Sequence, residues 1–540
     1  MNRHAVGNLL VLVGVCAAAL RAETYYVSTS GSESGPGTEN SPFNSIQKAL
    51  DAADQPGDTV LVRGGTYTQT FKFTHGGSPE GHITLKAHPE EEVIIQGGTP
   101  AFYQVQVPDA TSYVRIQGFT FRNYTGDPNI RPYLETTRRA AIQVRDKCQY
   151  VEILDNIITD THGPQGQAIS VRNHSLSIPT QHVLIDGNLF QRIDSNPGES
   201  VNLVGNVDEW IISNNEWKDN MKASNSTLDP EGGQPYGIDD SPTNGLIKNN
   251  YWHNSHGLYA DGSSGNIYDG NIFEDCPMAI CFSAEHAGMY SNDNIVINNI
   301  FIRTPVYSGM WSCCGDPYNT NQVVGTKFLN NITYGGSGWN LHWQSETVVY
   351  NNIFYGCGGI HLPNTKDIKI DYNLYYKTNA SGGSHSVNAD PLFVDPENGD
   401  FRVREGSPAI DAGCPDSGLF GATDYSGAER PAGTAPDIGI HEFGGAVEAA
   451  RKWLGTRSAT ANASAPRVSF VNGAFAVDAP RPVARLELMR PDGRRIASFT
   501  TGPGNSVPAA RWNTNAGLYL VRLHMRDGTV STGSLVIGGF

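Results

Sequence analysis

Short apolar segments of about four to six residues follow one another through the middle of the chain, separated by Gly and Asn. Apolar and polar residues alternate within each segment, which is the periodicity of β-strands. No part of this region repeats apolar residues at helical spacing. The pattern therefore predicts an all-β structure of many short strands.

A repeated phrase orders these strands. An asparagine followed by an apolar and then often an aromatic residue recurs at intervals of 32, 27, 35, 21, 28, 32, 21 and 21 residues, at Asn156, Asn188, Asn215, Asn250, Asn271, Asn299, Asn331, Asn352 and Asn373. A base period near 21 with insertions at fixed corners predicts a right-handed parallel β-helix with three strands per coil. The asparagines would stack inside one corner as a ladder. The alternative is nine unrelated surface turns.

The sequence divides the chain into four predicted segments. Residues 1–22 have a basic start, an apolar run and a small-residue end, which indicates a secretory signal peptide. Residues 23–445 form the β-helix domain, and a helix over residues 44–53 caps its first coil. Residues 446–466, rich in Ala, Ser and Thr, predict a linker, and residues 467–540 predict a small C-terminal β-sandwich.

Charge and cysteine content limit the classes of binding partner and the disulfides that are possible. The net charge of −16 argues against nucleic acid and anionic membranes as partners. We expect a secreted, extracellular or cell-surface monomer that has no membrane span and binds a polysaccharide or oligosaccharide. Export allows disulfides, but removal of the signal leaves seven cysteines, so at least one lacks a partner within the chain.

Two acidic residues lie one repeat apart in the segment His256–Gly288. If the strands begin at Ile238, Leu258 and Ile280, then Asp239, Asp261 and Glu285 point outward and form a diagonal across three coils. The carboxyl groups of Asp261 and Glu285 would be about 5 to 8 Å apart. An acid and a base on either side of one bond are what glycoside cleavage needs. An Asp before Gly is also a common turn former, so the alternative for Asp261 taken alone is a purely structural role in a turn.

Other outward residues would bind the substrate. Tyr259, Trp311 and His342 occupy the predicted outward row, His286 lies beside Glu285, and Trp343 follows His342. Trp311, Trp339 and Trp343 have a second reading as core residues. Because the interior of a small coil has little room for Trp, we expect them outside as platforms for sugar rings.

Several stretches resemble known families. The lead from residue 24, the coils and the segments "DPLFVDPENGDFRVREGSPAIDAG" and "DIGIHEFG" resemble secreted right-handed parallel β-helix proteins of the pectate-lyase-like superfamily, in which the last two stretches close the helix. "GLYLVRL" and the Gly-rich end resemble C-terminal sorting domains of type IX secretion, which implies the secretion machinery as a partner; a plain accessory module is the alternative.

A narrower resemblance concerns the candidate site. The block from "GES" through "YADGS" to "AEHAG" is similar to retaining β-xylosidases built on a β-helix. This resemblance implies Asp261 as nucleophile and Glu285 as acid/base. It also implies a site lined by Glu199, Asn202, Asn206 and Asp239. The residues around Asp261 depart from that family, which leaves the bond type open.

Three functions remain open. The first is a glycoside hydrolase acting on a plant or algal polysaccharide with the pair Asp261 and Glu285. The second is a Ca²⁺-dependent pectate-type lyase, with Asp239, Asp240 and Asp261 as metal ligands. Between residues 223 and 302 the one available cation for a lyase is Lys248, predicted beside the asparagine ladder and away from the outward row. Lys222 and Arg303, on either side of this interval, are the alternatives if loops bring them to the site. The third is a non-catalytic carbohydrate-binding or surface protein.

Overall fold

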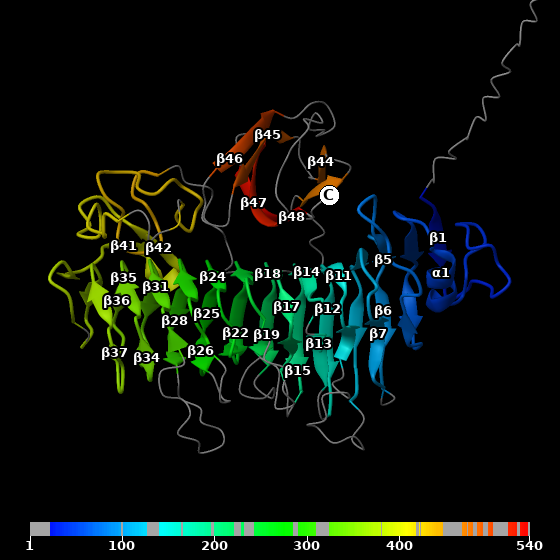
Figure 1. Ribbon diagram of the computed structural model, residues 1–540, viewed down its shortest axis with the longest axis horizontal. Helices are drawn as coiled ribbons and strands as arrows, with labels where there is room; N and C mark the ends of the chain where they lie inside the picture. Colours follow the sequence, from blue (N-terminus) through cyan, green and yellow to red (C-terminus); the bar gives the residue numbers. More distant parts are fainter. Residues whose placement is uncertain are drawn as a thin grey trace, which may run out of the picture.

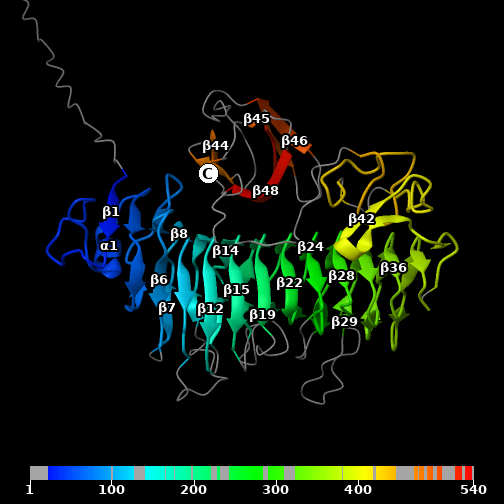
Figure 2. The ribbon, with the colours of Figure 1, turned by 180° about the vertical axis from the view of Figure 1, so that it is seen from behind.

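The computed structural model describes residues 22–98, 101–126, 140–163, 166–175, 177–195, 199–220, 228–231, 242–283, 290–308, 323–379, 381–416, 421 and 423–445, together with the strands beyond residue 466. In that part of the chain, short parallel strands stack coil upon coil into a rod (Figures 1 and 2). Each complete coil contributes one strand to each of three sheets. The predicted right-handed parallel β-helix is confirmed.

Each sheet runs the length of the rod, with strands paired in parallel register. Sheet 1 contains β1 (Thr24–Val27), β2 (Thr59–Val62), β5 (Ile83–Ala87), β8 (Val114–Gln117), β11 (Gln149–Leu154), β14 (Thr180–Asp186) with β17 (Val207–Asp208) beside it, β18 (Ile211–Ser213), β21 (Leu246–Lys248), β24 (Ile267–Asp269), β27 (Ile295–Ile297), β31 (Lys327–Leu329), β35 (Val348–Tyr350) and β38 (Lys369–Asp371). Sheet 2 contains β3 (Gly65–Tyr67), β6 (Val93–Gln96), β9 (Thr120–Arg122), β12 (Ile157–Thr161), β15 (Leu189–Ile193), β19 (Glu216–Asn220), β22 (Tyr251–Ser255), β25 (Ile272–Glu274), β28 (Ile300–Ile302), β32 (Ile332–Tyr334), β36 (Ile353–Tyr355), β39 (Leu374–Tyr376) and β40 (Val387–Asn388). Sheet 3 contains β4 (Phe71–Lys72), β7 (Tyr103–Val107), β10 (Ala140–Val144), β13 (Gln167–Asn173), β16 (Val201–Gly205), β20 (Leu228–Glu231), β23 (Leu258–Asp261), β26 (Ile280–Ser283), β29 (Val306–Ser308), β33 (Trp339–Leu341) and β37 (Ile360–His361).

The asparagine ladder is confirmed at the corner between sheets 1 and 2. From Asn156 to Asn373, the backbone N–H and the Nδ2 of each ladder residue donate to Oδ1 of the next, at 2.9–3.1 Å. The residue before each ladder asparagine has φ between 51° and 69°. Gly, Asn and Asp adopt this left-handed conformation most readily, which explains the recurring "GN", "NN" and "DN" pairs.

Aromatic rings fill the interior of the coils. Trp217 stacks on Trp252 with 4.5 Å between ring centroids, and Trp252 stacks on Phe273 at 4.6 Å. Trp339 is buried as well, with its Nε1 donating to Thr333 Oγ1 at 2.8 Å. The expectation that a coil leaves little room for Trp, and that Trp339 lies outside, is therefore wrong. Identical positions on successive coils are about 4.8 Å apart, which is also a favourable stacking distance.

A helix covers the first coil of the rod, and a long segment follows the last coil. The helix α1 (Ile46–Ala52) begins at the N-cap Ser45 and buries Ile46, Ala49 and Leu50 in the core at the first coil, as predicted (Figure 1). The segment 390–445 contains β41 (Phe393–Asp395), the 3₁₀ helix η3 (Pro396–Asn398) and β42 (Asp400–Val403).

This closing segment, residues 390–445, was expected to close the end of the β-helix. Phe393 and Phe401 instead pack against outward residues of β28, β32, β36 and β39, including Ile300 and Ile332. It therefore lies along the side of the last coils (Figure 2).

Short strands complete the described chain. They are β30 (Val323–Val324) paired with β34 (Gln344–Ser345), and then β43 (Arg467–Val471), β44 (Ala474–Asp478), β45 (Val483–Met489), β46 (Arg495–Thr500), β47 (Gly517–Met525) and β48 (Val530–Ile537). The last six form two antiparallel sheets, one of two strands and one of four; the C-terminal β-sandwich stays a prediction. The proposed signal peptide, apart from its last residue, and the linker 446–466 lie outside the described residues. No helix in the described part of the chain is long and apolar enough to span a membrane.

Candidate functional site

The outward face of sheet 3 carries the predicted site. Ile169, Val201, Leu258 and Ile280 point into the core, as expected from the alternation, so the next residue of each strand faces out. On β13, β16 and β26 these outward residues (Ser170, Asn202 and Cys281) are nevertheless buried, whereas Tyr259 on β23 is half-buried. The face is thus covered along these coils, and the polar side chains on it are removed from bulk water.

Asp261 ends β23 on this face and is only 1% exposed. The following Gly262 has φ 60° and donates its N–H to the Ser283 carbonyl at 2.9 Å, so a turn begins here as the "DG" pair predicts. Ser283 pairs with Asp261 on the next coil, and its buried hydroxyl has no hydrogen-bond partner among the described residues. A carboxylate outside the apolar core is therefore held in a buried, polar environment.

The neighbour of Asp261 on the preceding coil is Glu231. Strand β20 pairs Leu228 with Leu258 and Glu231 with Asp261, and on its other side it pairs Asp229 with Asn202. The prediction that this strand begins at Ile238 is wrong, because the sheet 3 strand of this coil is Leu228–Glu231. Leu228 lies 13 residues after the ladder residue Asn215, as Val201 does after Asn188, and this offset shared with the preceding coil is the signal that could have found β20.

The coils after β26 also differ from the predicted register. Cys281 pairs with Tyr307 on β29, and Tyr307 pairs with Asn340 on β33, so Trp311 does not hold the predicted position. His342 lies two residues beyond Asn340, and its ring is 6.0 Å from that of His361. Tyr307, Asn340 and His342 are half-buried. Sequence reasoning missed Tyr307 and Asn340 because the strand starts were set from the wrong apolar residues.

Trp343 and Tyr259 lie close to the face on which they were predicted. Trp343 is half-buried directly after His342, with φ 54°, and Tyr259 faces outward on β23 two residues before Asp261. Both lie on or next to the outward face of sheet 3.

The predicted residues on β16 divide into two groups. Asn202 is fully buried on the outward face, and its Nδ2 donates to Glu199 Oε2 at 3.3 Å. The structure thus brings these two together, two coils from Asp261. Asn206 instead donates its Nδ2 to the Ser175 carbonyl at 2.9 Å and so fastens the turn after β13. We therefore correct its expected role from lining the site to holding a corner.

A buried arginine lies on the same face. Arg172 on β13 is 2% exposed and donates Nη2 to His174 Nε2 at 2.6 Å, and His174 Nδ1 is 3.6 Å from Asp146. Burial alone would raise the pKa of Asp146, but the hydrogen bond from His174 and the charges of Arg145 and Arg172 lower it overall. By register, Arg172 is separated from Asp261 by Val204 and Glu231.

Several predicted residues lie outside the described part of the chain. They are Asp239, Asp240, Glu285, His286 and Trp311. Of the predicted diagonal of Asp239, Asp261 and Glu285, the structure describes Asp261 alone. Within the described residues, no group of three or more His, Cys, Asp or Glu is placed to hold a metal ion.

Two of the cations considered for a lyase, Lys248 and Arg303, lie elsewhere, and the third, Lys222, lies outside the described residues. Lys248 is on sheet 1, two residues before the ladder residue Asn250, with its Nζ 2.6 Å from Asp269 Oδ2, as the sequence predicts. Arg303 follows β28 and pairs with Asp275 at 2.6 Å and Glu274 at 3.0 Å. Both side chains are engaged away from the outward face of sheet 3.

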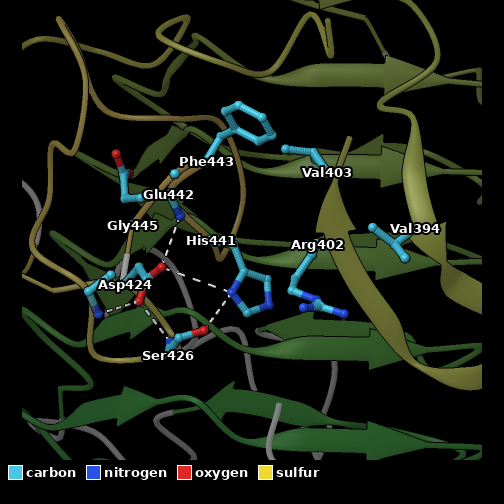
Figure 3. Close-up of a pocket in the computed structure, with 11 residues that line it drawn as sticks. Val394, Arg402, Val403, Asp424, Ser426, His441, Glu442, Phe443 and Gly445 are labelled. Atoms are coloured by element: carbon cyan, nitrogen blue, oxygen red, sulfur yellow. Dashed lines mark hydrogen bonds and ion pairs between the residues drawn. The ribbon is translucent and has the colours of Figure 1, made fainter. Parts of the chain in front are cut away.

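A separate cavity of about 240 Å³ lies between β42 and residues 424–445 (Figure 3). Ser426 Oγ is 2.8 Å and Asp424 Oδ2 3.9 Å from the same nitrogen of His441, Nδ1, so the three do not form a nucleophile–base–acid relay. Burial lowers the pKa of His441 to about 4. Asp424 also accepts N–H bonds from Ser426, Ala428 and Glu442 at 2.8–2.9 Å. These contacts indicate a structural role in holding the closing segment.

Comparison with known proteins points to the same fold. Residues 25–205 match a family model described as "Pel9A-like, right handed beta helix region", and residues 140–311 match "Right handed beta helix region". The chain is 25% identical over 444 residues to uncharacterized protein YwoF of Bacillus subtilis (strain 168), which covers 71% of this chain and 91% of that protein. The likeness is thus to pectate-lyase-like right-handed β-helix proteins.

Two further matches are more limited. The chain is 40% identical over 98 residues to pectate lyase PEL9 of Emericella nidulans, which is 17% of this chain and 24% of that enzyme. The solved structure of XylC with xylose has a TM-score of 0.53 at 14% identity, covering 78% of this chain and 98% of XylC. The likeness to XylC is one of fold.

Proposed function

We propose that this protein is a secreted carbohydrate-active enzyme that hydrolyses glycosidic bonds of a polysaccharide on the outward face of sheet 3. One observation carries the proposal: Asp261 is buried outside the apolar core and adjoins Glu231 in register on the preceding coil. Asp is almost never fully buried without a specific partner or role. The polysaccharide-degrading relative PEL9 and the β-helix family matches support a carbohydrate substrate.

The chemistry follows from two acids on neighbouring coils. Adjacent coils are about 4.8 Å apart, and repulsion between two carboxylates at that spacing favours a proton on one of them. The protonated acid donates to the leaving oxygen, while the ionised one attacks the anomeric carbon or activates water. Asp261 serves as the ionised group. Its partner is Glu285, as the xylosidase resemblance implies, or Glu231, as the register places it.

A Ca²⁺-dependent lyase is the second candidate, and the identity to pectate lyase PEL9 favours it. A lyase needs a basic side chain that removes the proton at C5 of a uronate. The ion pairs of Lys248 with Asp269 and of Arg303 with Asp275 count against both as that base. Hydrolysis needs no such residue, which is why we prefer it.

The test is the loss of cleavage in single variants. Asp261→Asn, Glu231→Gln and Glu285→Gln keep side-chain size and remove one ionisable group each. We expect Asp261→Asn and one of the two Glu variants to lose about 10²–10⁴-fold in kcat on the polysaccharide that the wild type cleaves. Asp367→Asn, on an exposed turn, is the matched control and should keep full activity. Full activity of Asp261→Asn would overturn the proposal.

A further inference from the structure

Charge is distributed unevenly along the outward face of sheet 3. Arg145 follows β10, where its Nε is 3.3 Å from Asp109, and Arg172 lies on β13. From β23 onward the sheet 3 strands lack such cations. The sheet 3 strands of these coils and the stretches beside them, residues 256–266, 276–294, 304–322, 335–347 and 356–365, contain no Lys or Arg. The first cation beyond them is Lys366, which is exposed and 3.6 Å from Asp367.

The outward residues described on and beside β29, β33 and β37 include no carboxylate, Lys or Arg. We call the outward residues Tyr307, Asn340, His342 and His361 the downstream surface. Its near end lies two coils, about 10 Å, from Asp261, and its far end lies four coils, about 19 Å, from Asp261. Burial, and secondarily the neighbouring His361, lowers the pKa of His342, so its imidazole is uncharged at neutral pH. Hydroxyl, amide and imidazole groups both donate and accept hydrogen bonds, as sugar hydroxyls require.

We propose that the sugar units bound over the downstream surface are uncharged, so that the substrate is a neutral polysaccharide or one whose uronates are esterified. This rests on the proposed function, because it assigns a substrate class to the same face. A polyuronate bound there would place a carboxylate on each sugar unit, with no Lys or Arg in residues 256–266, 276–294, 304–322, 335–347 and 356–365 to compensate. Binding would then remove these carboxylates from water without a counter-charge, which costs free energy.

Binding of a polyuronate would require positive charge near its carboxylates. Proteins bind polyuronates with Lys and Arg or with calcium held by several carboxylates. The ion pairs of Arg303 direct its guanidinium toward Asp275 and Glu274, away from the downstream surface. An arginine on the upstream coils, such as Arg172, leaves the downstream sugar units without a counter-charge.

The experiment compares polymers that differ only in charge. Homogalacturonan, alginate and glucuronoxylan are each used native and after carbodiimide-borohydride reduction, which converts the carboxyl to a hydroxymethyl group. Binding to the full-length Asp261→Asn variant is measured by affinity electrophoresis, in EDTA and in calcium. In every pair that binds, we expect the reduced form to bind at least tenfold more tightly, which is about 1.4 kcal/mol.

Each outcome is decisive. Equal or tighter binding of a native form, with or without calcium, overturns the inference and leaves the proposed function intact. Binding of no polymer at all contradicts the proposed function together with the inference. As a matched pair, Asn340→Lys should strengthen binding of the native form about tenfold, whereas Gln117→Lys on sheet 1 should not. Equal effects of the two variants would show that the sugar units do not lie over the downstream surface.

Discussion

Replacing one ladder asparagine tests the physical basis of the fold. Asn271 makes four buried side-chain hydrogen bonds: Oδ1 accepts from the N–H and the Nδ2 of Asn250, both at 3.0 Å, and Nδ2 donates to the Ile247 carbonyl at 2.9 Å and to Asn299 Oδ1 at 3.0 Å. Asn271→Ala removes all four and leaves the N–H of Asn250 buried without its acceptor. At about 0.5–1.5 kcal/mol net for each bond, the expected loss of unfolding free energy is about 2–6 kcal/mol.

Urea unfolding followed by Trp fluorescence measures this loss, since Trp252 stacks on Phe273 beside the ladder. The control is Asn388→Ala, which removes an exposed asparagine from β40 and should change the unfolding free energy by less than about 0.5 kcal/mol. A loss below about 1 kcal/mol for Asn271→Ala would refute the reasoning, because the ladder would then be dispensable.

Three other changes have defined outcomes. Burial lowers the pKa of His441 from 6.5 to about 4, so the folded protein binds fewer protons than the unfolded chain between these pH values. The free energy of unfolding therefore falls as pH drops from about 6.5 to 4, by about 3 kcal/mol at about 1.36 kcal/mol per pKa unit. His441→Gln should flatten that part of a curve of unfolding free energy against pH. Trp252→Ala should lower the unfolding free energy by about 3–5 kcal/mol in the same urea assay, through the cavity that it opens in the ring stack. Lys248→Ala and Arg303→Ala should retain polysaccharide cleavage in a reducing-end assay; a drop of a hundredfold in either would favour the lyase.

The fold was predictable because its repeats have a strict physical cause. A buried asparagine at the same corner of each coil satisfies the backbone of its neighbours, and the left-handed residue before it restricts the choice mostly to Gly, Asn or Asp. Both constraints leave a trace in the sequence. The helix over Ile46–Ala52 was predictable from its apolar positions at the start of the rod.

The site was less predictable because insertions obscure register. The coil between Asn215 and Asn250 is 35 residues long, and the sequence offers two apolar starts for its sheet 3 strand, Leu228 and Ile238. A wrong choice replaced Asp229 and Glu231 by Asp239 in the predicted row. The tryptophans were misplaced for a different reason: a single ring is large for one coil, but rings at the same position of successive coils stack on one another.

The mode of cleavage is the most direct test of the central claim. The wild-type protein is incubated with the polysaccharide that it cleaves in water enriched in ¹⁸O, and the products are analysed by mass spectrometry. Hydrolysis adds the oxygen of water to the new reducing end, so the account predicts one ¹⁸O in each newly formed reducing-end product and none formed by Asp261→Asn. Unlabelled products lighter by one water, with a double bond at the non-reducing end, would contradict it and establish elimination.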